Sequence, residues 1–246
     1  MKKERIDKLL VDYGFVESYI KARSLIMAGI VLVNDKRIEK PSEQFTSDVS
    51  IRLKGKAEDS KFVGRGGIKL EKALEVFQIC SDGYVCLDVG ASTGGFTDCL
   101  LQNGAKKIYT VDVGTNQLVW KLRNDSRVEV REKVNARNLK PDDFAEKFDL
   151  IVMDVSFISV TKILPALTDL LNETGKIIVL IKPQFEVAKG QVGKGGIVRD
   201  EEKHETVKYK INEFAKSIGL LNAGLIESPI LGAEGNKEFL ALYEKG

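Results

Sequence analysis

The sequence has little of several features that mark specialised classes of protein. Its 246 residues include only three cysteines, one histidine and one tryptophan, and 38 basic side chains nearly balance 36 acidic ones. The longest apolar stretches, such as residues 177–181, are far shorter than the roughly 18 residues of a membrane-spanning helix, and no apolar signal core follows Met1. We therefore expect an ordinary globular protein of the cytoplasm, with no membrane partner.

The few cysteines argue against a metal site. Cys80, Cys86 and Cys99 lack the paired spacing of zinc ligands, and the single His204 cannot complete a site with them. Their number is also odd, which is not typical of a disulfide framework. We therefore expect no bound metal and interpret all three cysteines as buried thiols.

The hydrophobic pattern changes near residue 60. In the first sixty residues, apolar positions recur at helical spacing, with Ser18 as a predicted helix cap and Gly29 as a predicted stop. These residues carry 12 basic and 10 acidic side chains, whereas the rest of the chain is neutral. A polar link at 54–65 follows, so we predict two domains, residues 1–60 and 61–246.

The second part alternates helices with short apolar strands. Strands are predicted at 84–89, 107–113, 128–132, 148–155, 176–182 and 239–243. Nearly continuous apolar strands separated by helices are typical of a doubly wound α/β fold with a parallel sheet. Ligands bind such sheets in the crevice at the carboxyl ends of the strands, so the polar residues at the strand tips are the candidate site.

A glycine-rich turn, DVGASTGGF at 88–96, follows the first of these strands. Gly90, Gly94 and Gly95 let the backbone approach a ligand closely, and the next helix offers free backbone donors. A tight turn without a ligand is the alternative explanation for the glycines alone. Asp112, at the tip of the next strand, favours a nucleotide-like cofactor, because a carboxylate there can accept hydrogen bonds from both ribose hydroxyls.

The residues around the turn indicate which cofactor it binds. Phe96-Thr97 follows the last glycine, where an ATP or GTP loop needs Lys and then Ser or Thr, and the G-x-G-x-x-G of dinucleotide folds is absent. Asp88, directly before the turn, suits a cationic ligand such as S-adenosylmethionine better than a pyrophosphate. The sequence thus favours S-adenosylmethionine.

The same segment resembles the first motif of the class I S-adenosylmethionine-dependent methyltransferases, and its GGF ending is similar to the FtsJ-type 2′-O-ribose methyltransferases. The resemblance implies a Rossmann-like, mostly parallel sheet whose last strand is antiparallel. It also implies a cofactor site formed by Asp88, Gly90, Ser92, Gly94, Gly95, Phe96, Asp112, Asn135 and Ala136.

Charged residues stand where catalytic groups are expected. Asp154 and Lys182 lie at the tips of two predicted strands, Glu238 directly precedes the last strand, and Lys69 lies in the first turn of a helix, where the helix dipole disfavours a cation. Each alone has an ordinary explanation, such as a helix cap or a lysine in water. Together they match, in order, the Lys-Asp-Lys-Glu tetrad of FtsJ-type enzymes.

Methylation of a ribose hydroxyl requires a positioned nucleophile and a route for its proton. The resemblance implies that Lys182 orients the 2′-oxygen, that Asp154 holds Lys182, and that Lys69 and Glu238 fix the ribose and the partner charges. Whether Lys182 is a true base stays open, because neighbouring carboxylates favour its ammonium form. Carbon methylation and amine methylation fit less well, because no cysteine lies near these strand tips and no Pro-Pro pair follows Asp154.

The first part resembles a small α+β RNA-binding domain first seen in a ribosomal small-subunit protein. The resemblance rests on residues 5–15, 21–35 and 40–42. It implies phosphate contacts along the two helices, with Tyr19 at a position where that family usually has Arg. The implied RNA-binding residues are Lys3, Arg5, Tyr19, Lys21 and Arg23. We also expect Arg65, at the end of the polar link, to bind RNA.

The chain joins the small RNA-binding domain to an FtsJ-like domain. This combination is similar to the TlyA family, as are the segments RGGIKL at 65–70, KPQFE at 182–186 and KGGIVRD at 194–200. The resemblance implies 2′-O-methylation of cytidine in ribosomal RNA, with ribosomal RNA or a ribosomal subunit as partner. A non-catalytic RNA-binding or ribosome-assembly factor is the alternative. Some family members were described as haemolysins, but no segment here has a membrane-seeking pattern. The nucleotide, the subunit and the oligomeric state stay open.

Overall fold

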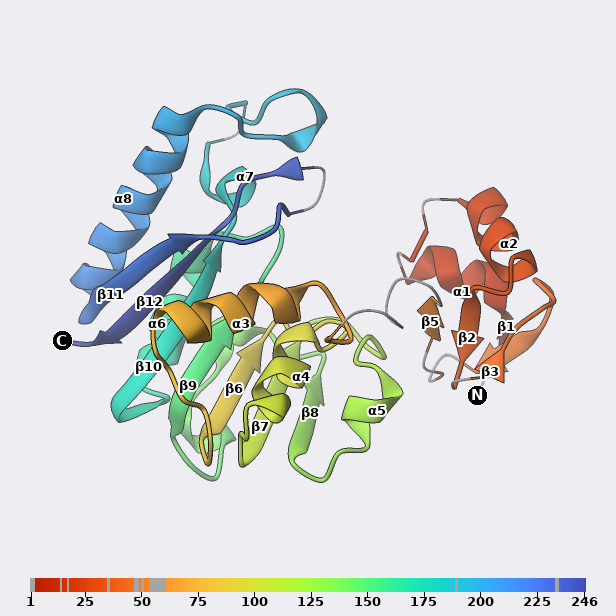
Figure 1. Cartoon of the computed structure of the whole chain (residues 1–246), viewed down its shortest axis with the longest axis horizontal. Helices are drawn as coiled ribbons and strands as arrows, with labels where there is room; N and C mark the ends of the chain where they lie inside the picture. Colours follow the sequence, from red (N-terminus) through yellow and green to blue (C-terminus); the bar gives the residue numbers. More distant parts are fainter. Residues whose placement is uncertain are drawn as a thin grey trace.

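The computed structural model describes residues 3–13, 15–16, 18–34, 36–46, 49, 51–53, 61–188, 190–232 and 235–246. They form a small unit near the N-terminus and a larger α/β unit (Figure 1). The boundary predicted near residue 60 lies outside the described residues and stays a prediction.

The small unit packs two helices against short strands. The strands are β1 (Lys3–Arg5), β2 (Val31–Val33), β3 (Lys36–Arg37), β4 (Gln44–Thr46) and β5 (Ile51–Leu53), and the helices are α1 (Ile6–Asp12) and α2 (Tyr19–Met27). β1 pairs with β4, and β2 lies between β3 and β5. Ile6, Leu10 and Ile26 are fully buried between these elements, so apolar burial holds the unit together.

Two details of this unit bear on the sequence-based predictions. Ser18 caps α2 as predicted, since its side chain accepts a hydrogen bond from the backbone N–H of Lys21 at 3.3 Å. Gly29 follows the helix with φ +67°, which favours glycine. Lys3 and Arg5, which were expected on the helices, instead lie on strand β1, because pairing with β4 keeps this segment extended.

The large unit is built on a seven-stranded sheet. Its strands are β6 (Val85–Val89), β7 (Lys107–Asp112), β8 (Val128–Glu132), β9 (Phe148–Met153), β10 (Leu171–Ile181), β11 (Leu220–Glu227) and β12 (Phe239–Lys245). The spatial order is β11-β12-β10-β9-β6-β7-β8, and β12 is antiparallel to both of its neighbours. The predicted mostly parallel sheet with an antiparallel last strand is therefore confirmed.

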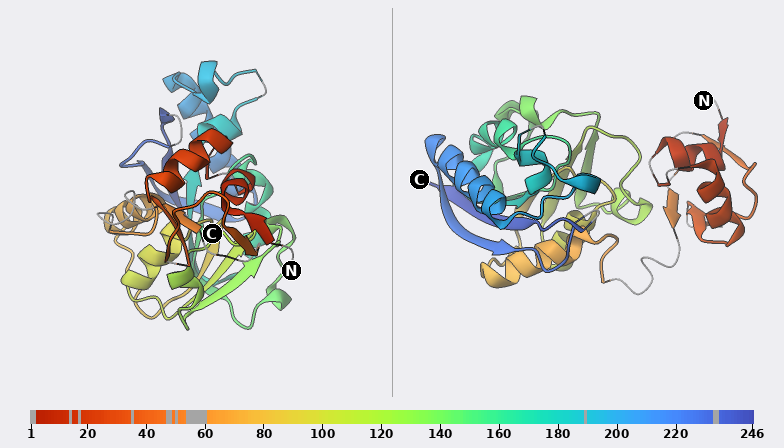
Figure 2. Two further views of the ribbon diagram at one scale, coloured as in Figure 1. Left: turned by 90° about the vertical axis from the view of Figure 1, so that its right-hand side faces the viewer. Right: turned by 90° about the horizontal axis from the view of Figure 1, so that it is seen from above.

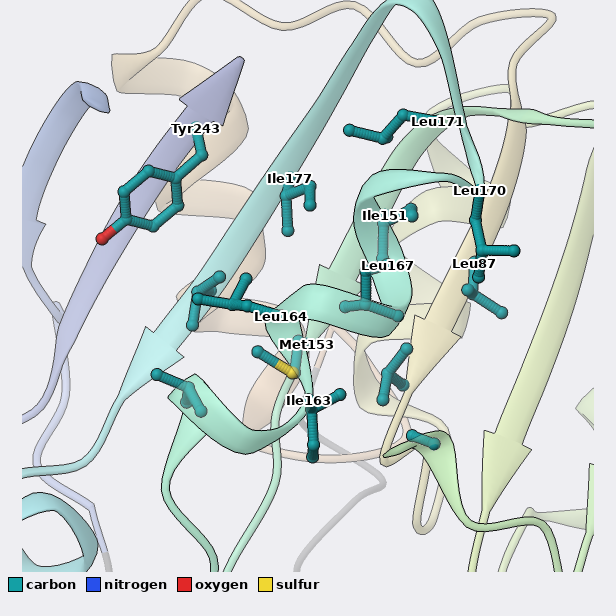
Figure 3. Packing of buried hydrophobic residues seen from close by; sticks show 14 of the residues in the cluster. Leu87, Ile151, Met153, Ile163, Leu164, Leu167, Leu170, Leu171, Ile177 and Tyr243 are labelled. Carbon is teal, nitrogen blue, oxygen red and sulfur yellow. The ribbon is translucent and has the colours of Figure 1, made fainter. Parts of the chain in front are cut away.

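Helices cover both faces of this sheet (Figure 2). They are α3 (Gly66–Val76), α4 (Gly95–Gln102), α5 (Trp120–Arg123), α6 (Leu164–Thr168), α7 (Pro183–Glu186) and α8 (Glu201–Ser217). One apolar cluster joins the sheet to α6 and α8 and includes Leu167, Ile177 and Tyr243 (Figure 3). A second cluster joins the opposite face to α3 and α4. Because alternate residues of a strand point to opposite faces and both faces are covered, the central strands are mostly apolar, with polar exceptions such as Asp88 on β6.

The sequence-based predictions were wrong at two places in this unit. Strand β11 was not predicted, because at the edge of the sheet most of its residues are only partly buried or exposed and the apolar pattern is weak. Cys80 is exposed, whereas Cys86 and Cys99 are buried as expected. Cys80 lies in the turn between α3 and β6, outside the packed layers. No helix in the described part of the chain is long and apolar enough to cross a membrane.

Candidate active site

The glycine-rich turn has a backbone shape that only glycine allows at two positions. Gly90 has φ +85°, and a Cβ there would lie 2.2 Å from the carbonyl oxygen of Asp154. Gly94 has φ +98°, and a Cβ there would lie 2.3 Å from Leu122 Cδ1. A Cβ at Gly90 would collide with backbone, and a Cβ at Gly94 would displace the buried Leu122 side chain. These glycines therefore let the turn pack closely against the residue after β9 and against α5.

Asp112 joins this turn to the end of β7. Its Oδ2 accepts a hydrogen bond from the backbone N–H of Ser92 at 2.9 Å, and its Oδ1 accepts one from that of Gly114 at 2.8 Å. Each carboxylate oxygen has a further lone pair, because an ionised carboxylate offers about four acceptor sites. Asp112 can therefore hold the turn and still accept hydrogen bonds from a ligand.

A cavity of about 600 Å³ opens beside this carboxylate. Five of the predicted cofactor residues line it, namely Gly90, Ser92, Asp112, Asn135 and Ala136. A smaller cavity of about 190 Å³ adjoins it and is lined by Gly95 and Phe96. Asp154 lines both cavities, so one of the predicted catalytic residues lies where they meet.

Sequence reasoning missed several residues that line the large cavity, such as Val113, Gln117, Arg137 and Ile158. They follow the carboxyl ends of β7, β8 and β9. Their place after a strand tip is the signal that could have identified them, since ligands of parallel sheets bind there.

Asp88 and Gly94 line neither cavity. Asp88 is fully buried, and its Oδ2 accepts a hydrogen bond from Thr97 Oγ1 at 2.6 Å. Burial raises the pKa of this carboxyl to about 7. The expectation that Asp88 faces a cationic ligand does not fit this geometry, because the side chain points behind the turn toward α4.

Three predicted catalytic residues come from neighbouring strands. β10 and β12 pair in a register that brings Lys182, just after β10, beside Glu238, just before β12. β9 flanks β10 on the other side and runs parallel to it, and Asp154 follows its last residue. Lys69 reaches the same edge from the first turn of α3.

The four side chains form two ion pairs. Lys182 Nζ lies 2.5 Å from Asp154 Oδ1 and donates a hydrogen bond to Ser156 Oγ at 3.0 Å. Lys69 Nζ lies 2.5 Å from Glu238 Oε2. The side chains of Lys69 and Glu238 are 9% and 2% exposed, against 12% and 23% for Lys182 and Asp154. The second pair is therefore sealed in the protein, while the first is more open to a substrate.

An exposed aromatic ring stands beside this edge. Phe157 is 91% exposed, lines the large cavity and has φ +64°, a region that side chains rarely adopt. Its ring centre lies 5.1 Å from that of Phe185 on α7. Sequence reasoning missed Phe157, although an aromatic residue three positions after the predicted catalytic Asp154 was a visible signal.

Two of the predicted RNA-binding residues share a buried carboxylate. Arg5 donates to both oxygens of Asp7, at 3.0 and 2.7 Å, and Arg23 Nε donates to Oδ2 at 3.2 Å. Asp7 is only 2% exposed, and the hydrogen bonds from Arg5 lower the pKa of its carboxyl despite burial. Both arginines remain largely exposed, so they can still meet a phosphate.

The other predicted RNA-binding residues divide between the two units. Lys3, Tyr19 and Lys21 are exposed on the small unit. Arg65 lies on the large unit, where its guanidinium donates to the carbonyl oxygen of Leu231 at 2.6 Å, and it lines the smaller cavity. We call the sheet edge with the predicted catalytic residues Lys69, Asp154, Lys182 and Glu238 the catalytic edge. Arg65 is thus separate from the other five and lies near this edge, since it shares the lining of the smaller cavity with Asp154.

Comparison with known proteins matches both units. Residues 62–245 match the model of the FtsJ-like methyltransferase family, and residues 4–50 match that of the S4 domain. Hemolysin A of Brachyspira hyodysenteriae is 45% identical over 97% of this chain and 99% of its own length. The 16S/23S rRNA (cytidine-2′-O)-methyltransferase TlyA of Mycobacterium tuberculosis is 41% identical over 97% of this chain and 88% of its own. A solved structure from Streptococcus thermophilus, 48% identical, superposes with a TM-score of 0.74 and covers 100% of this chain and 89% of that one.

Proposed function

Since this chain belongs to the FtsJ-like methyltransferase family, in the TlyA group that also carries an S4 domain, we propose that it methylates the 2′-hydroxyl of cytidine in ribosomal RNA, with S-adenosylmethionine as donor. One observation carries the proposal. The ion pairs Lys182–Asp154 and Lys69–Glu238 lie at the same edge of the sheet as the large cavity. Of the four residues, Asp154 lines the cavity, and its ion pair with Lys182 brings that ammonium beside it.

The large cavity suits S-adenosylmethionine in size and chemistry. Its volume of about 600 Å³ lies within the usual range for small-ligand sites. Asp112 would accept hydrogen bonds from the ribose hydroxyls, and Asn135 and Ala136 would flank the adenine. When bound, the cofactor supplies a methyl group on a positively charged sulfur. The loop residues Gly90 and Ser92 allow it to lie close to the backbone.

The catalytic edge supplies position and charge. Lys182, held by Asp154, would donate a hydrogen bond to the 2′-oxygen and hold it in line with the methyl group. The hydroxyl proton would pass to the Lys182–Asp154 pair, whose carboxylate is the group able to accept it while Lys182 is an ammonium ion. Lys69 and Glu238, being sealed, would fix the electrostatic surroundings rather than touch the nucleophile.

The remaining features suit a structured RNA substrate. Phe157 offers an exposed ring beside the edge, and aromatic rings in RNA-binding proteins stack on unpaired bases. The exposed cations of the small unit, among them Arg5, Lys21 and Arg23, would contact phosphates away from the reaction. The paired charges and the cavity favour this reading over the non-catalytic alternative.

The test is a map of ribose methylation in ribosomal RNA. Mass spectrometry of RNA from cells with and without this gene should show one or more 2′-O-methylcytidines only when the gene is present. Purified protein with S-adenosylmethionine should restore them on subunits or RNA from the deletion strain. Identical methylation patterns in the two strains, and no transfer in vitro, would refute the proposal.

A further inference from the structure

Glu186, the last residue of α7, has a half-buried carboxylate that contacts the loop after β9. Its Oε2 accepts a hydrogen bond from Ser159 Oγ at 2.6 Å, and its Oε1 accepts one from the backbone N–H of Val160 at 2.9 Å. Ser159 in turn caps the short 3-10 helix Val160–Lys162, because its Oγ accepts from the backbone N–H of Thr161 at 3.3 Å. One carboxylate thus fixes both the cap and the first residue of that helix.

The loop held by Glu186 carries groups of the catalytic edge. It begins at Asp154, the ion-pair partner of Lys182, and continues through Ser156, which accepts a hydrogen bond from the same ammonium. It also contains Phe157 at φ +64°, and such backbone persists only where its surroundings hold it. Lys182 directly precedes α7 and Glu186 is its last residue, so both ends of α7 contact this loop.

Local stability alone is a weak explanation for this carboxylate. Burial raises the pKa of the Glu186 carboxyl, and its two hydrogen bonds only partly offset this. Burial therefore destabilises the ionised form of Glu186. Glu186 lines neither cavity, and its hydrogen bonds go to the loop. Ionisable groups with shifted pKa values cluster near functional sites. Glu186 follows β10, the strand that leads to Lys182, and it contacts the loop after β9 that begins at Asp154. This arrangement points to a role in positioning.

We propose that Glu186 is a positioning residue for methyl transfer, which holds residues 154–160 so that Asp154 keeps Lys182 aligned with the 2′-oxygen. This rests on the function proposed above, because it concerns the same reaction. Glu186 would act through the loop and would not touch the cofactor or the ribose.

Single-turnover methylation at saturating cofactor and RNA tests the proposal. In Glu186→Ala we expect the rate to fall by about tenfold to hundredfold, because small misplacements of reacting groups have effects of this size. Glu186→Gln should stay within about threefold of the wild type, since its amide oxygen can accept from Val160 and its amide N–H can donate to Ser159 Oγ. Glu205→Ala, which removes an exposed carboxylate on α8, is the matched control.

A folded Glu186→Ala protein that methylates within about twofold of the wild type would overturn the proposal. Should that variant fail to fold, Ser159→Ala removes one of the two donors and leaves the carboxylate and its bond to Val160 in place. Its rate should fall severalfold in a protein of unchanged fold. An unchanged rate in Ser159→Ala would count equally against the proposal.

Hydrogen exchange supplies a readout that does not depend on activity. The Val160 amide should exchange faster in Glu186→Ala, while amides of the central strand β6 should keep their protection. Unchanged exchange at Val160 would overturn the positioning role even if the wild type methylates RNA normally. A wild type that methylates no ribosomal RNA, with faster Val160 exchange in the variant, would instead refute the proposed function and leave the contact between Glu186 and the loop established.

Discussion

The two units hold their charged side chains in opposite ways. In the small unit, Arg5 and Arg23 are 45% and 58% exposed and share the buried carboxylate of Asp7. In the large unit, the ammonium of Lys69 is buried together with its partner Glu238. A cation that binds a phosphate must face outward, where salt screens it. A cation that stabilises charge during a reaction is more effective when it is buried away from water, because the lower dielectric constant strengthens its electric field.

The buried aspartates of the two units differ in the same way. Asp7 has two arginine partners, and the pKa of its carboxyl is lowered. Asp88 is hydrogen-bonded to the Thr97 hydroxyl, and burial raises the pKa of its carboxyl to about 7. Burial acts on both in the same direction, so the nearby cations decide the sign of the shift.

The largest expected effect concerns the more open ion pair of the catalytic edge. Lys182→Ala should reduce single-turnover methylation by about 10²- to 10⁴-fold, because the interaction is realised mainly in the transition state. Cofactor affinity, measured by calorimetric titration, should change little. Lys216→Ala, on the exposed face of α8, is the control. Near-normal methylation by the Lys182 variant would remove Lys182 from the catalytic set.

The second-largest expected effect is the loss of RNA affinity when the small unit is removed. A chain that begins at Lys61 keeps Phe62, which is 1% exposed in the core of the large unit, and should fold and bind S-adenosylmethionine. It should lose most of its affinity for ribosomal RNA, and its binding should depend less steeply on salt, because fewer phosphates are neutralised. Lys21→Ala combined with Arg23→Ala should reproduce part of this loss. Equal methylation of intact ribosomal RNA by the short and full chains would show that the small unit does not dock the substrate.

Asp112→Ala should weaken cofactor binding by about 1–3 kcal/mol, the usual loss when a charged hydrogen-bond partner is removed. Part of this loss would come from the turn, since the backbone N–H groups of Ser92 and Gly114 also lose their acceptor. Calorimetric titration measures it, with Asp142→Ala, at an exposed position, as control. Affinity equal to that of the wild type would place the cofactor elsewhere.

The opposite pKa shifts predict opposite effects of pH on stability. The raised pKa of Asp88 stabilises the folded state fully below the unfolded pKa near 3.8. This stabilisation, on the order of 4 kcal/mol, should be lost as pH rises toward about 7. The lowered pKa of Asp7 stabilises the folded state above the unfolded pKa near 3.8. This stabilisation is lost as pH falls through the lowered folded pKa.

Unfolding curves between pH 3 and 8 check both signs. Fluorescence of Trp120, the single tryptophan, reports on the large unit, where Asp88→Asn should flatten the decline between about pH 4 and 7. Amide resonances of the small unit report on Asp7→Asn, which should remove stability chiefly above pH 4. A steeper decline in the Asp88 variant would contradict the assigned sign.

The smallest effect concerns the cysteines. Iodoacetamide should modify the native protein at Cys80, while Cys86 and Cys99 should react only after unfolding, since burial raises the pKa of both thiols, that of Cys99 to about 12. Mass spectrometry of the alkylated peptides gives the answer. Equal modification of all three in the native state would contradict the packing of the second apolar cluster.

Much of the site could be predicted because it depends on local pattern. Each central strand is a short apolar run, and the parallel arrangement brings the strand tips to one edge. The positions of Asp112, Asp154 and Lys182 at that edge therefore follow from the sequence. The turn at Gly90 was also predicted, from the glycine-rich pattern after the first strand, and its φ of +85° agrees with that prediction.

The tertiary structure alone decided that Lys69 pairs with Glu238 and which side chains turned inward. Lys69 and Glu238 are 169 residues apart in the chain, and no local pattern relates them before α3 and β12 pack. Asp88 turned toward Thr97, Arg65 toward Leu231, and Cys80 remained in an exposed turn. Local periodicity sets where a strand begins and ends, whereas burial and pairing depend on neighbours that only folding of the whole chain brings together.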